Sequence, residues 1–284
     1  MDRTLVIVTC LNDSWHFELL CNTMQQFLEP CQVLIISNED DYFSRVWKNW
    51  FDINIAKKLS KFNIQVKQRS DFLLSEYLEY KTPGWYTQQI LKLSAFKYVT
   101  TDRYVLLDSK NFLTQQIQLQ EIEQRKPKFI SDNNKFYNFI LASYAHFNID
   151  PPEYVYLIEN LTPFIICKDT AASLINRFGG SDETFNVMMN LVTKEQQMGV
   201  SEFYFYGIYE QFLGIKNDTA CVDNNVILIN STNINHPYTY LDSKIFGINR
   251  LVFDNKSERD VFTLLEKLNC INCIPTQSSP YKIK

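Results

Sequence analysis

Two stretches decide the fold: Gly84-Trp85-Tyr86-Thr87-Gln88-Gln89-Ile90-Leu91-Lys92-Leu93, and further on Tyr104-Val105-Leu106-Leu107-Asp108-Ser109-Lys110-Asn111. The first stretch predicts a helix with polar side chains among apolar ones, and the second predicts a hydrophobic strand that ends in an acid. A continuous apolar run, in place of an alternating one, indicates a strand that is covered on both faces. The pair therefore predicts a layered α/β sheet.

Apolar runs elsewhere in the chain alternate with helical segments. Leu5–Val8 and Val33–Ile36 flank a predicted helix that stops at Pro30. This β-α-β pattern requires a parallel pair of strands and a right-handed crossover. The remaining predicted strands are Ile64–Val66, Phe164–Cys167 and Val226–Ile229, and helices are predicted to begin at Asp169, Ser181 and Ser257. We expect one α/β domain over residues 1–274, with a C-terminal helix, and a loosely ordered tail over residues 275–284.

The composition limits the classes of function. The chain has 284 residues, 28 basic and 32 acidic side chains and a net charge of −4, so we expect no nucleic-acid partner. No segment approaches the ~20 apolar residues that cross a bilayer, and Met1–Cys10 does not resemble a signal peptide. We therefore expect a soluble, cytoplasmic protein without a membrane span, for which peripheral contact with a membrane stays open.

The seven cysteines are scattered through apolar contexts, so reduced thiols are expected. Only Cys270 and Cys273 have the C-x-x-C spacing. We interpret them as two packed thiols at the end of a helix, because a zinc site would need a second Cys or His pair nearby.

The predicted helix from Trp85 carries a polar stripe. Trp85, Gln88, Gln89 and Lys92 share one side at the helical period, while apolar residues cover the neighbouring faces. Buried amides and amines need partners, so a ligand or a buried network must satisfy them. The alternative is that Lys92 reaches out to solvent and the glutamines cap a neighbouring strand.

Polar residues also follow the predicted strands, where ligands collect in an open parallel sheet. Thr9 ends the first strand, Asn38–Asp40 forms an acidic turn, and Asp108 ends the strand from Tyr104. Asp108 can hold Mg²⁺ or Mn²⁺. Lys110 stands where a second acid is usual, however, and its ammonium can itself neutralise a diphosphate, so a site that requires no cofactor stays open as well. A plain strand-terminating turn is a further alternative.

The motifs above occur together with Thr162-Pro163-Phe164 and Ser201-Glu202-Phe203-x-x-Tyr206-Gly207. In this combination the chain resembles a bacterial family of largely uncharacterised GT-A-type glycosyltransferases, whose members are similar to enzymes of surface-polysaccharide biosynthesis. The likeness extends from about Leu5 to Leu268, and its specific parts are the block Gly84–Lys92 and the turn Asp108–Lys110.

The resemblance implies a GT-A-like layered fold, a nucleotide-sugar donor and a saccharide or lipid-linked acceptor. The donor diphosphate is expected near Asp108. The predicted donor-binding residues are Thr9, Gln88, Gln89, Lys92, Asp108 and Lys110. In the late segment Phe246–Arg250, Asn249 stands where the resemblance leads us to expect a histidine, and His236 is nearby in sequence.

Glu202 is the predicted catalytic base. Glycosyl transfer with inversion needs a carboxylate that takes the proton of the acceptor hydroxyl, and the resemblance implies a base in this segment. Trp85 and Tyr206 are the predicted acceptor-binding rings. The alternative for Glu202 is structural, with Ser201 as the cap of a helix and Glu202 in its first turn.

Two other classes of function stay open. A sugar nucleotidyltransferase would use a similar sheet, but it usually has a Gly-rich, basic loop after the first strand, and Thr9-Cys10-Leu11-Asn12 is not such a loop. A non-catalytic saccharide-binding protein with this fold would explain the missing second acid after Asp108.

Overall fold

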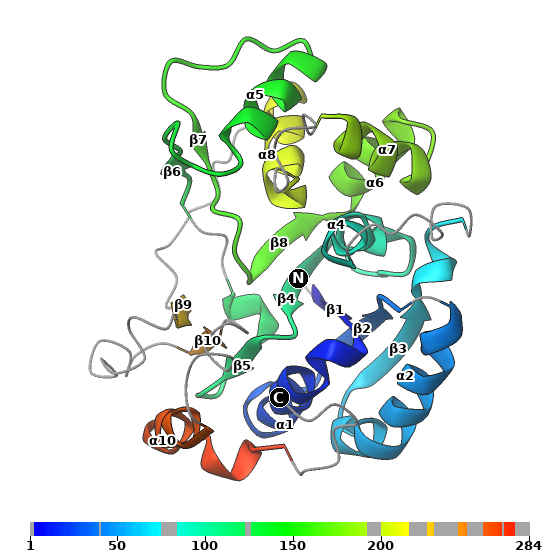
Figure 1. Ribbon diagram of the computed structural model, residues 1–284, viewed down its shortest axis with the longest axis vertical. Helices are drawn as coiled ribbons and strands as arrows, with labels where there is room; N and C mark the ends of the chain where they lie inside the picture. The colour runs from blue at the N-terminus through cyan, green and yellow to red at the C-terminus, as the bar shows by residue number, and fades with distance from the viewer. Residues whose placement is uncertain are drawn as a thin grey trace.

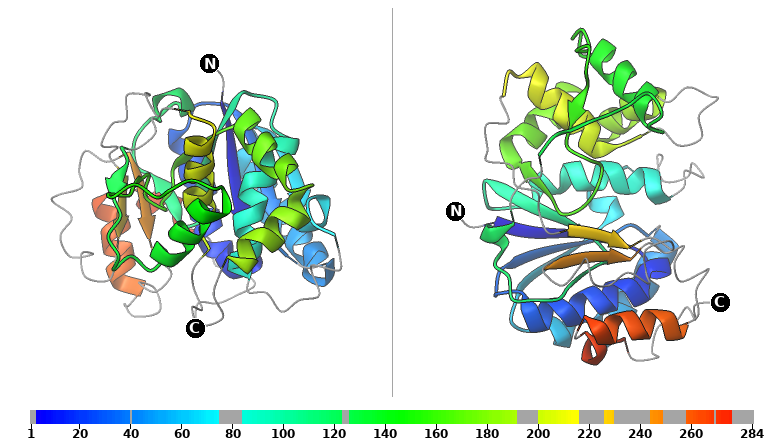
Figure 2. Two further views of the ribbon diagram at one scale, coloured as in Figure 1. Left: turned by 90° about the horizontal axis from the view of Figure 1, so that it is seen from above. Right: turned by 90° about the vertical axis from the view of Figure 1, so that its left-hand side faces the viewer.

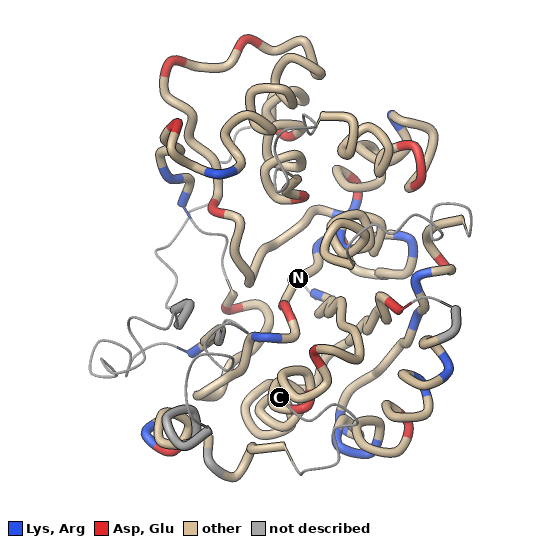
Figure 3. Tube along the Cα trace, viewed as in Figure 1, with Lys and Arg blue, Asp and Glu red and all other residues tan. Residues whose placement is uncertain are grey.

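The computed structural model describes residues 3–39, 41–74, 84–122, 126–191, 200–215, 226–229, 244–248, 258–268 and 270–275. A central sheet lies between two groups of helices (Figures 1 and 2). Basic and acidic residues are interspersed along these ranges (Figure 3). No helix within them is long and apolar enough to cross a membrane.

The central sheet has five strands in the order β3-β2-β1-β4-β8. Four of them, β1 (Arg3–Thr9), β2 (Gln32–Ser37), β3 (Asn63–Gln68) and β4 (Arg103–Asp108), are parallel. The edge strand β8 (Phe164–Cys167) is antiparallel to β4. The predicted α/β fold with a mostly parallel central sheet is confirmed.

Both faces of this sheet are buried, which explains why its strands have continuous apolar runs. Leu5 and Ile7 pack into the cluster on the face of α1 (Ser14–Phe27) and α2 (Asp41–Asn54), whereas Val6 and Val8 pack into the cluster on the opposite face. The helices of that opposite face are α4 (Gly84–Ser94), α5 (Tyr137–His146), α6 (Lys168–Arg177), α7 (Ser181–Asn190) and α8 (Glu202–Phe212).

The predicted helix starts need one correction. Helix α6 begins at Lys168, directly after β8, so Cys167 occupies the cap position and Asp169 lies in the first turn. Helix α7 begins at Ser181, as predicted. Ser201 caps α8, because its side chain accepts the N–H of Tyr204.

A second, three-stranded sheet has the order β5-β10-β9. It consists of β5 (Asn111–Leu113), β9 (Val226–Ile229) and β10 (Ile245–Ile248). Phe112 and Phe246 stack in it and pack against leucines of α10 (Glu258–Lys267) and against Cys270 and Cys273. Both cysteines are buried and free, which fits packed thiols.

A third, two-stranded sheet pairs β6 (Lys128–Phe129) with β7 (Tyr156–Leu157), and we refer to it as the ribbon. It lies beyond the central sheet, on the side of α5 (Figure 1). The domain bounds stay a prediction, and residues 276–284 of the predicted tail, like Ser257, lie outside the described ranges.

We predict that Tyr104→Phe lowers the free energy of unfolding by about 1–2 kcal/mol. The buried Tyr104 hydroxyl donates to the carbonyl oxygens of Lys92 at 3.0 Å and Leu93 at 3.1 Å. These carbonyls belong to the last turn of α4, where a helix leaves its carbonyls without partners in the helix. Urea denaturation followed by circular dichroism measures the change.

Tyr98→Phe is the matched control. Its hydroxyl donates over a longer distance, 3.4 Å, to the exposed carbonyl oxygen of Asp71, so the free energy of unfolding should change by less than about 0.5 kcal/mol. Equal losses in the two variants would contradict a structural role for the Tyr104 hydroxyl.

Candidate functional site

A cleft of about 690 Å³ lies at the carboxyl ends of β1 and β4. This volume is typical of sites that bind small molecules. Its walls come from the turn after β1, from α4, from the turn after β4, from the N-terminus of α8, and from the ribbon with the segment Glu159–Leu161. The cleft therefore collects side chains from segments that are far apart in the sequence.

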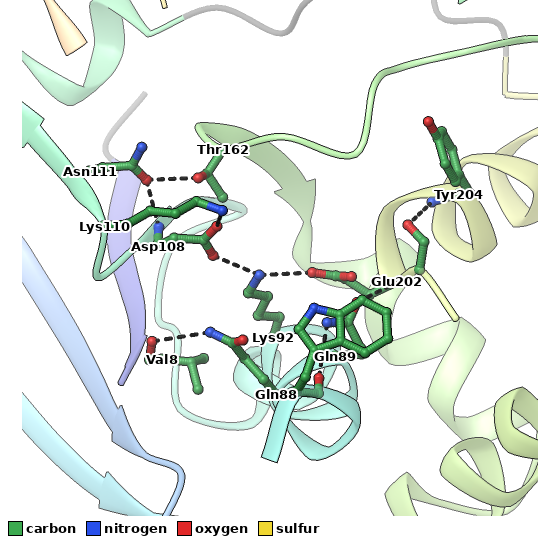
Figure 4. A network of polar contacts seen from close by, with 12 residues as sticks. Val8, Gln88, Gln89, Lys92, Asp108, Lys110, Asn111, Thr162, Glu202 and Tyr204 are labelled. Carbon is green, nitrogen blue, oxygen red and sulfur yellow. Dashed lines mark hydrogen bonds and ion pairs between the residues drawn. The ribbon is translucent and has the colours of Figure 1, made fainter. Parts of the chain in front are cut away.

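The centre of the cleft wall is a chain of charges built on Lys92. Its ammonium lies 2.8 Å from Oδ1 of Asp108 and 2.9 Å from Oε1 of Glu202 (Figure 4). The same ammonium lies 5.0 Å from the centre of the Phe203 ring. Lys92 and Glu202 are almost completely buried. The predicted donor residues Lys92 and Asp108 and the predicted base Glu202 thus meet in one cluster.

The turn after β4 holds Asp108 in place. The side-chain oxygen of Asn111 accepts the backbone N–H of Asp108 at 2.7 Å and the hydroxyl of Thr162 at 2.7 Å. Ser109 donates to Oδ2 of Asp13 at 3.1 Å. The backbone therefore forms the strand-terminating turn that the sequence offered as an alternative. The side chains of Asp108 and Lys110, at this turn, line the cleft.

The two glutamines of α4 serve a buried network. Gln88 donates to the carbonyl of Val8 at 3.4 Å and so caps the end of β1. This agrees with one half of the alternative that the sequence left open, but Lys92 is buried and does not reach out to solvent. Gln89 accepts the N–H of Glu202 at 3.3 Å and donates to the carbonyl of Trp85 at 3.1 Å. Both glutamines also line the cleft. Gln89 thus positions the first turn of α8. Donor binding by Gln88 and Gln89 stays a prediction.

The cluster shifts the pKa of each member. Burial works to raise the pKa of Asp108, but the ammonium groups of Lys92 and Lys110 outweigh it and hold the pKa below its usual range. Burial works to lower the pKa of Lys92, but Asp108 and Glu202 outweigh it and hold the pKa above its usual value. Burial raises the pKa of Glu202, and Lys92 only partly offsets this. Asp108 and Lys92 are therefore charged, and Glu202 is the member that holds a proton most readily.

The two carboxylate oxygens of Glu202 differ in their contacts. Its Oε1 contacts Lys92, whereas its Oε2 is buried and has no hydrogen-bond partner among the described residues. A buried oxygen without a partner costs about 1–3 kcal/mol. Glu202 lines the cleft, although this oxygen is itself shielded from solvent.

The residues around Asp108 do not fit a divalent metal. One oxygen of Asp108 contacts Lys92, and the other lies 3.2 Å from the ammonium of Lys110. Two cations in contact with the carboxylate oppose a third. Among the described residues, no group of three or more His, Cys, Asp or Glu side chains is arranged to hold a metal ion. Lys110 is 37% exposed in the cleft and can contact an anion.

Two of the predicted site residues do not line the cleft. Thr9 is buried at the end of β1, so a contact with the donor is not supported. Tyr206 is also buried, and its hydroxyl accepts the backbone N–H of Cys167 at 3.0 Å. Tyr206 therefore does not line the cleft, and acceptor binding by it is not supported. Tyr204, on another side of α8, lines the cleft instead.

The acidic turn after β2 is structural. Asn38 donates to the carbonyl of Gly84 at 2.6 Å and accepts the hydroxyl of Thr87 at 2.7 Å, and Glu39 accepts the N–H of Leu11. Asp40, His236, Asn249 and Arg250 lie outside the described residues.

The aromatic wall of the cleft includes Trp85, whose ring stacks near Phe136 with centroids 6.4 Å apart. Acceptor binding by Trp85 stays a prediction. The sequence did not indicate that Asp13 and His16, after β1, also line the cleft. A single acid or histidine near a helix start is usually a capping or packing residue, so it carries no further signal.

Comparison with solved structures finds the crystal structure of mouse xyloside xylosyltransferase 1 in its apo form. It shares 9% sequence identity with this chain at a TM-score of 0.49, and the match covers 89% of this chain and 99% of that chain. No curated protein matches the sequence. Residues 4–240, most of the chain, match the family described as "Family of unknown function (DUF6492)", and the chain belongs to this family.

Proposed function

We propose that this chain is a glycosyltransferase that moves a sugar from a nucleotide-sugar donor to a saccharide or lipid-linked acceptor, as in the biosynthesis of surface polysaccharides. One observation carries the proposal: Glu202 is a buried carboxylate in the cleft wall with one oxygen fixed by Lys92 and the other without a partner among the described residues. This is the arrangement that a general base requires, because the base must be oriented and still able to accept a proton.

In the proposed reaction the acceptor hydroxyl attacks the anomeric carbon of the donor sugar. The hydroxyl proton goes to Oε2 of Glu202, the new glycosidic bond forms, and the bond between the sugar and the diphosphate breaks. The raised pKa of Glu202 makes its carboxylate a stronger base than an exposed one. Asp108 stays ionised and has a lowered pKa, so within the cluster around Lys92 it is the weaker base and Glu202 the stronger one.

Lys110 is the proposed partner of the leaving diphosphate. Its ammonium lies in the cleft beside Asp108, at the carboxyl end of β4, where ligands of such sheets bind. We propose that this ammonium takes the role of a metal ion as counter-charge to the diphosphate, because the carboxylate of Asp108 is already neutralised.

A non-catalytic saccharide-binding protein is the second candidate. The ion pair between Lys92 and Glu202 favours it, since the ammonium lowers the pKa of this carboxylate and so opposes the burial that makes Glu202 basic. Release of nucleoside diphosphate from a nucleotide sugar distinguishes the two candidates, because only a transferase releases it.

We predict that Glu202→Gln lowers the rate of transfer by about 10²–10⁴-fold and leaves the affinity for nucleoside diphosphate within a factor of about three. The amide keeps the size of the side chain but cannot accept the proton. Release of nucleoside diphosphate from a panel of nucleotide sugars measures the rate, and calorimetry measures the affinity. In the unmodified chain, kcat/KM should rise with pH above the ordinary range of a glutamic acid, since the pKa of Glu202 is raised.

Glu210→Gln is the matched control. Glu210 lies on the same helix and burial raises its pKa to about 7, but it does not line the cleft. Its variant should keep transfer activity. Full turnover in the Glu202 variant would exclude Glu202 as the base.

We predict that Lys110→Ala weakens the binding of nucleoside diphosphate by about 10- to 150-fold, because one charge-assisted hydrogen bond to a phosphate is lost. Calorimetry with UDP, GDP and dTDP, in the presence of either Mn²⁺ or a chelator, measures the affinity. Lys48→Ala is the control, since Lys48 forms an exposed pair with Asp52 on α2. Unchanged affinity in the Lys110 variant, or binding that requires Mn²⁺, would refute the counter-charge role.

We predict that Lys92→Met lowers the free energy of unfolding by about 3–5 kcal/mol, because Asp108 and Glu202 lose the cation between them. Adding Glu202→Gln to this variant should restore part of the loss. The exposed control Lys57→Met should change stability by less than about 0.5 kcal/mol. Urea denaturation measures all three. A stable Lys92 variant that only loses nucleotide affinity would instead identify Lys92 as a phosphate ligand.

A further inference from the structure

The outer face of the ribbon presents three exposed aromatic rings. Phe129 pairs directly with Tyr156 across the two strands, so both side chains lie on one face. Tyr154 lies beside them. The ring centroid of Phe129 is 6.2 Å from that of Tyr154 and 6.0 Å from that of Tyr156. The exposed fractions are 52% for Phe129, 58% for Tyr154 and 54% for Tyr156. We call these three residues the aromatic face.

The ribbon does not need these rings in order to fold, because the side chains on its opposite side are buried. Ile130, Val155 and Leu157 are buried in the main core, and Ile130 donates its N–H to the carbonyl of Val155 at 2.8 Å. A half-buried antiparallel pair normally turns polar residues outward. Three adjacent rings in their place mark a surface that binds a partner.

The aromatic face is continuous with the cleft. Phe129 belongs to both, because it lines the cleft together with Lys128 and with the segment Glu159–Leu161 that follows the ribbon. Lys128 and Glu159 form an ion pair of 2.9 Å at this boundary. A molecule whose reacting end lies in the cleft can therefore extend directly over the rings.

We propose that the aromatic face binds the saccharide acceptor, as a platform for sugar residues beyond the one that reacts. The inference rests on the proposed glycosyl transfer and adds the acceptor-binding surface and its preference for oligosaccharides with apolar ring faces. Pyranose rings carry C–H groups on their faces and hydroxyls at their edges. Aromatic rings stack on the C–H faces, and the tyrosine hydroxyls can form hydrogen bonds with the sugar hydroxyls.

The charges at the boundary favour a neutral oligosaccharide. Glu159 neutralises Lys128, the basic residue of the ribbon that lines the cleft next to Phe129. Attraction to an anionic membrane surface depends on clustered basic residues whose charge is available, so this boundary is a poor one for lipid headgroups. An anionic membrane is the alternative partner, and the vesicle experiment below distinguishes it from a saccharide.

The test uses the full chain and the variants Phe129→Ala, Tyr156→Ala and Phe129→Leu. Immobilised cello-, xylo-, manno- and chitotetraose are the probes, and the tetraose that the unmodified chain retains is titrated against each variant. We expect an affinity about tenfold lower for each ring removed, because each loses one stacking contact. Phe129→Leu, which keeps an apolar side chain, should also lose affinity if the ring itself is recognised.

Phe43→Ala is the matched control, since Phe43 is an exposed aromatic residue of α2, on the opposite face of the central sheet. Its affinity for the tetraose should not change. All variants should keep their melting temperature, because the rings are outside the core. Unchanged tetraose affinity in the ribbon variants would overturn the proposal, as would an unmodified chain that retains none of the four sugars.

Two further measurements separate the alternatives. Co-sedimentation with vesicles of phosphatidylglycerol and phosphatidylethanolamine tests the membrane, and a loss of vesicle binding in the ribbon variants without loss of tetraose binding would overturn the proposal. Calorimetry with UDP, GDP and dTDP tests the donor site, where the ribbon variants should match the unmodified chain. If the chain binds a tetraose through the ribbon but neither binds nor hydrolyses nucleotide sugars, the saccharide site stands and the proposed transferase activity fails.

Discussion

The ammonium group of Lys92 is the element on which the rest of the site depends. It joins helix α4 to Asp108 at the end of β4 and to Glu202 at the start of α8, so one buried cation fixes three segments. Buried charges are tolerated only when they are paired and their remaining hydrogen-bonding groups are satisfied. The neighbouring segments support this arrangement, because Tyr104 holds the end of α4 and Gln89 holds the first residue of α8. Among the described residues, Oε2 of Glu202 is a buried oxygen that has no partner.

The sequence predicted the parts of this arrangement that follow from local patterns. Continuous apolar runs gave the strands, and the rule that ligands collect at strand ends placed Asp108 at the cleft. The helical period put Gln88, Gln89 and Lys92 on one side of α4, and a buried network indeed satisfies their polar groups. These predictions succeed because each depends on neighbours within a few residues.

The remaining features depend on contacts that no local pattern records. Lys92 and Glu202 are 110 residues apart in sequence, so their ion pair becomes visible only when α4 and α8 pack together. Tyr206 was assigned to the cleft because it is close to Glu202 in sequence, but its side chain is buried toward β8. The ribbon has strands of two residues, too short to show a period of alternation. Its aromatic face was therefore missed.

The two carboxylates beside Lys92 have opposite pKa shifts, although they share one cation. Asp108 has a second ammonium nearby in Lys110, which keeps it ionised. Glu202 is more deeply buried, and Lys92 is the one cation that contacts it within the described part of the chain. A pair of acids whose environments separate their pKa values is the pattern by which acid–base roles are assigned in enzymes. In this cluster the anion of Asp108 holds Lys92 in its charged form, and Glu202 is the more basic of the two carboxylates. Under the proposed function, the ammonium of Lys110 would contact the anionic donor and Oε2 of Glu202 would contact the hydroxyl-bearing acceptor.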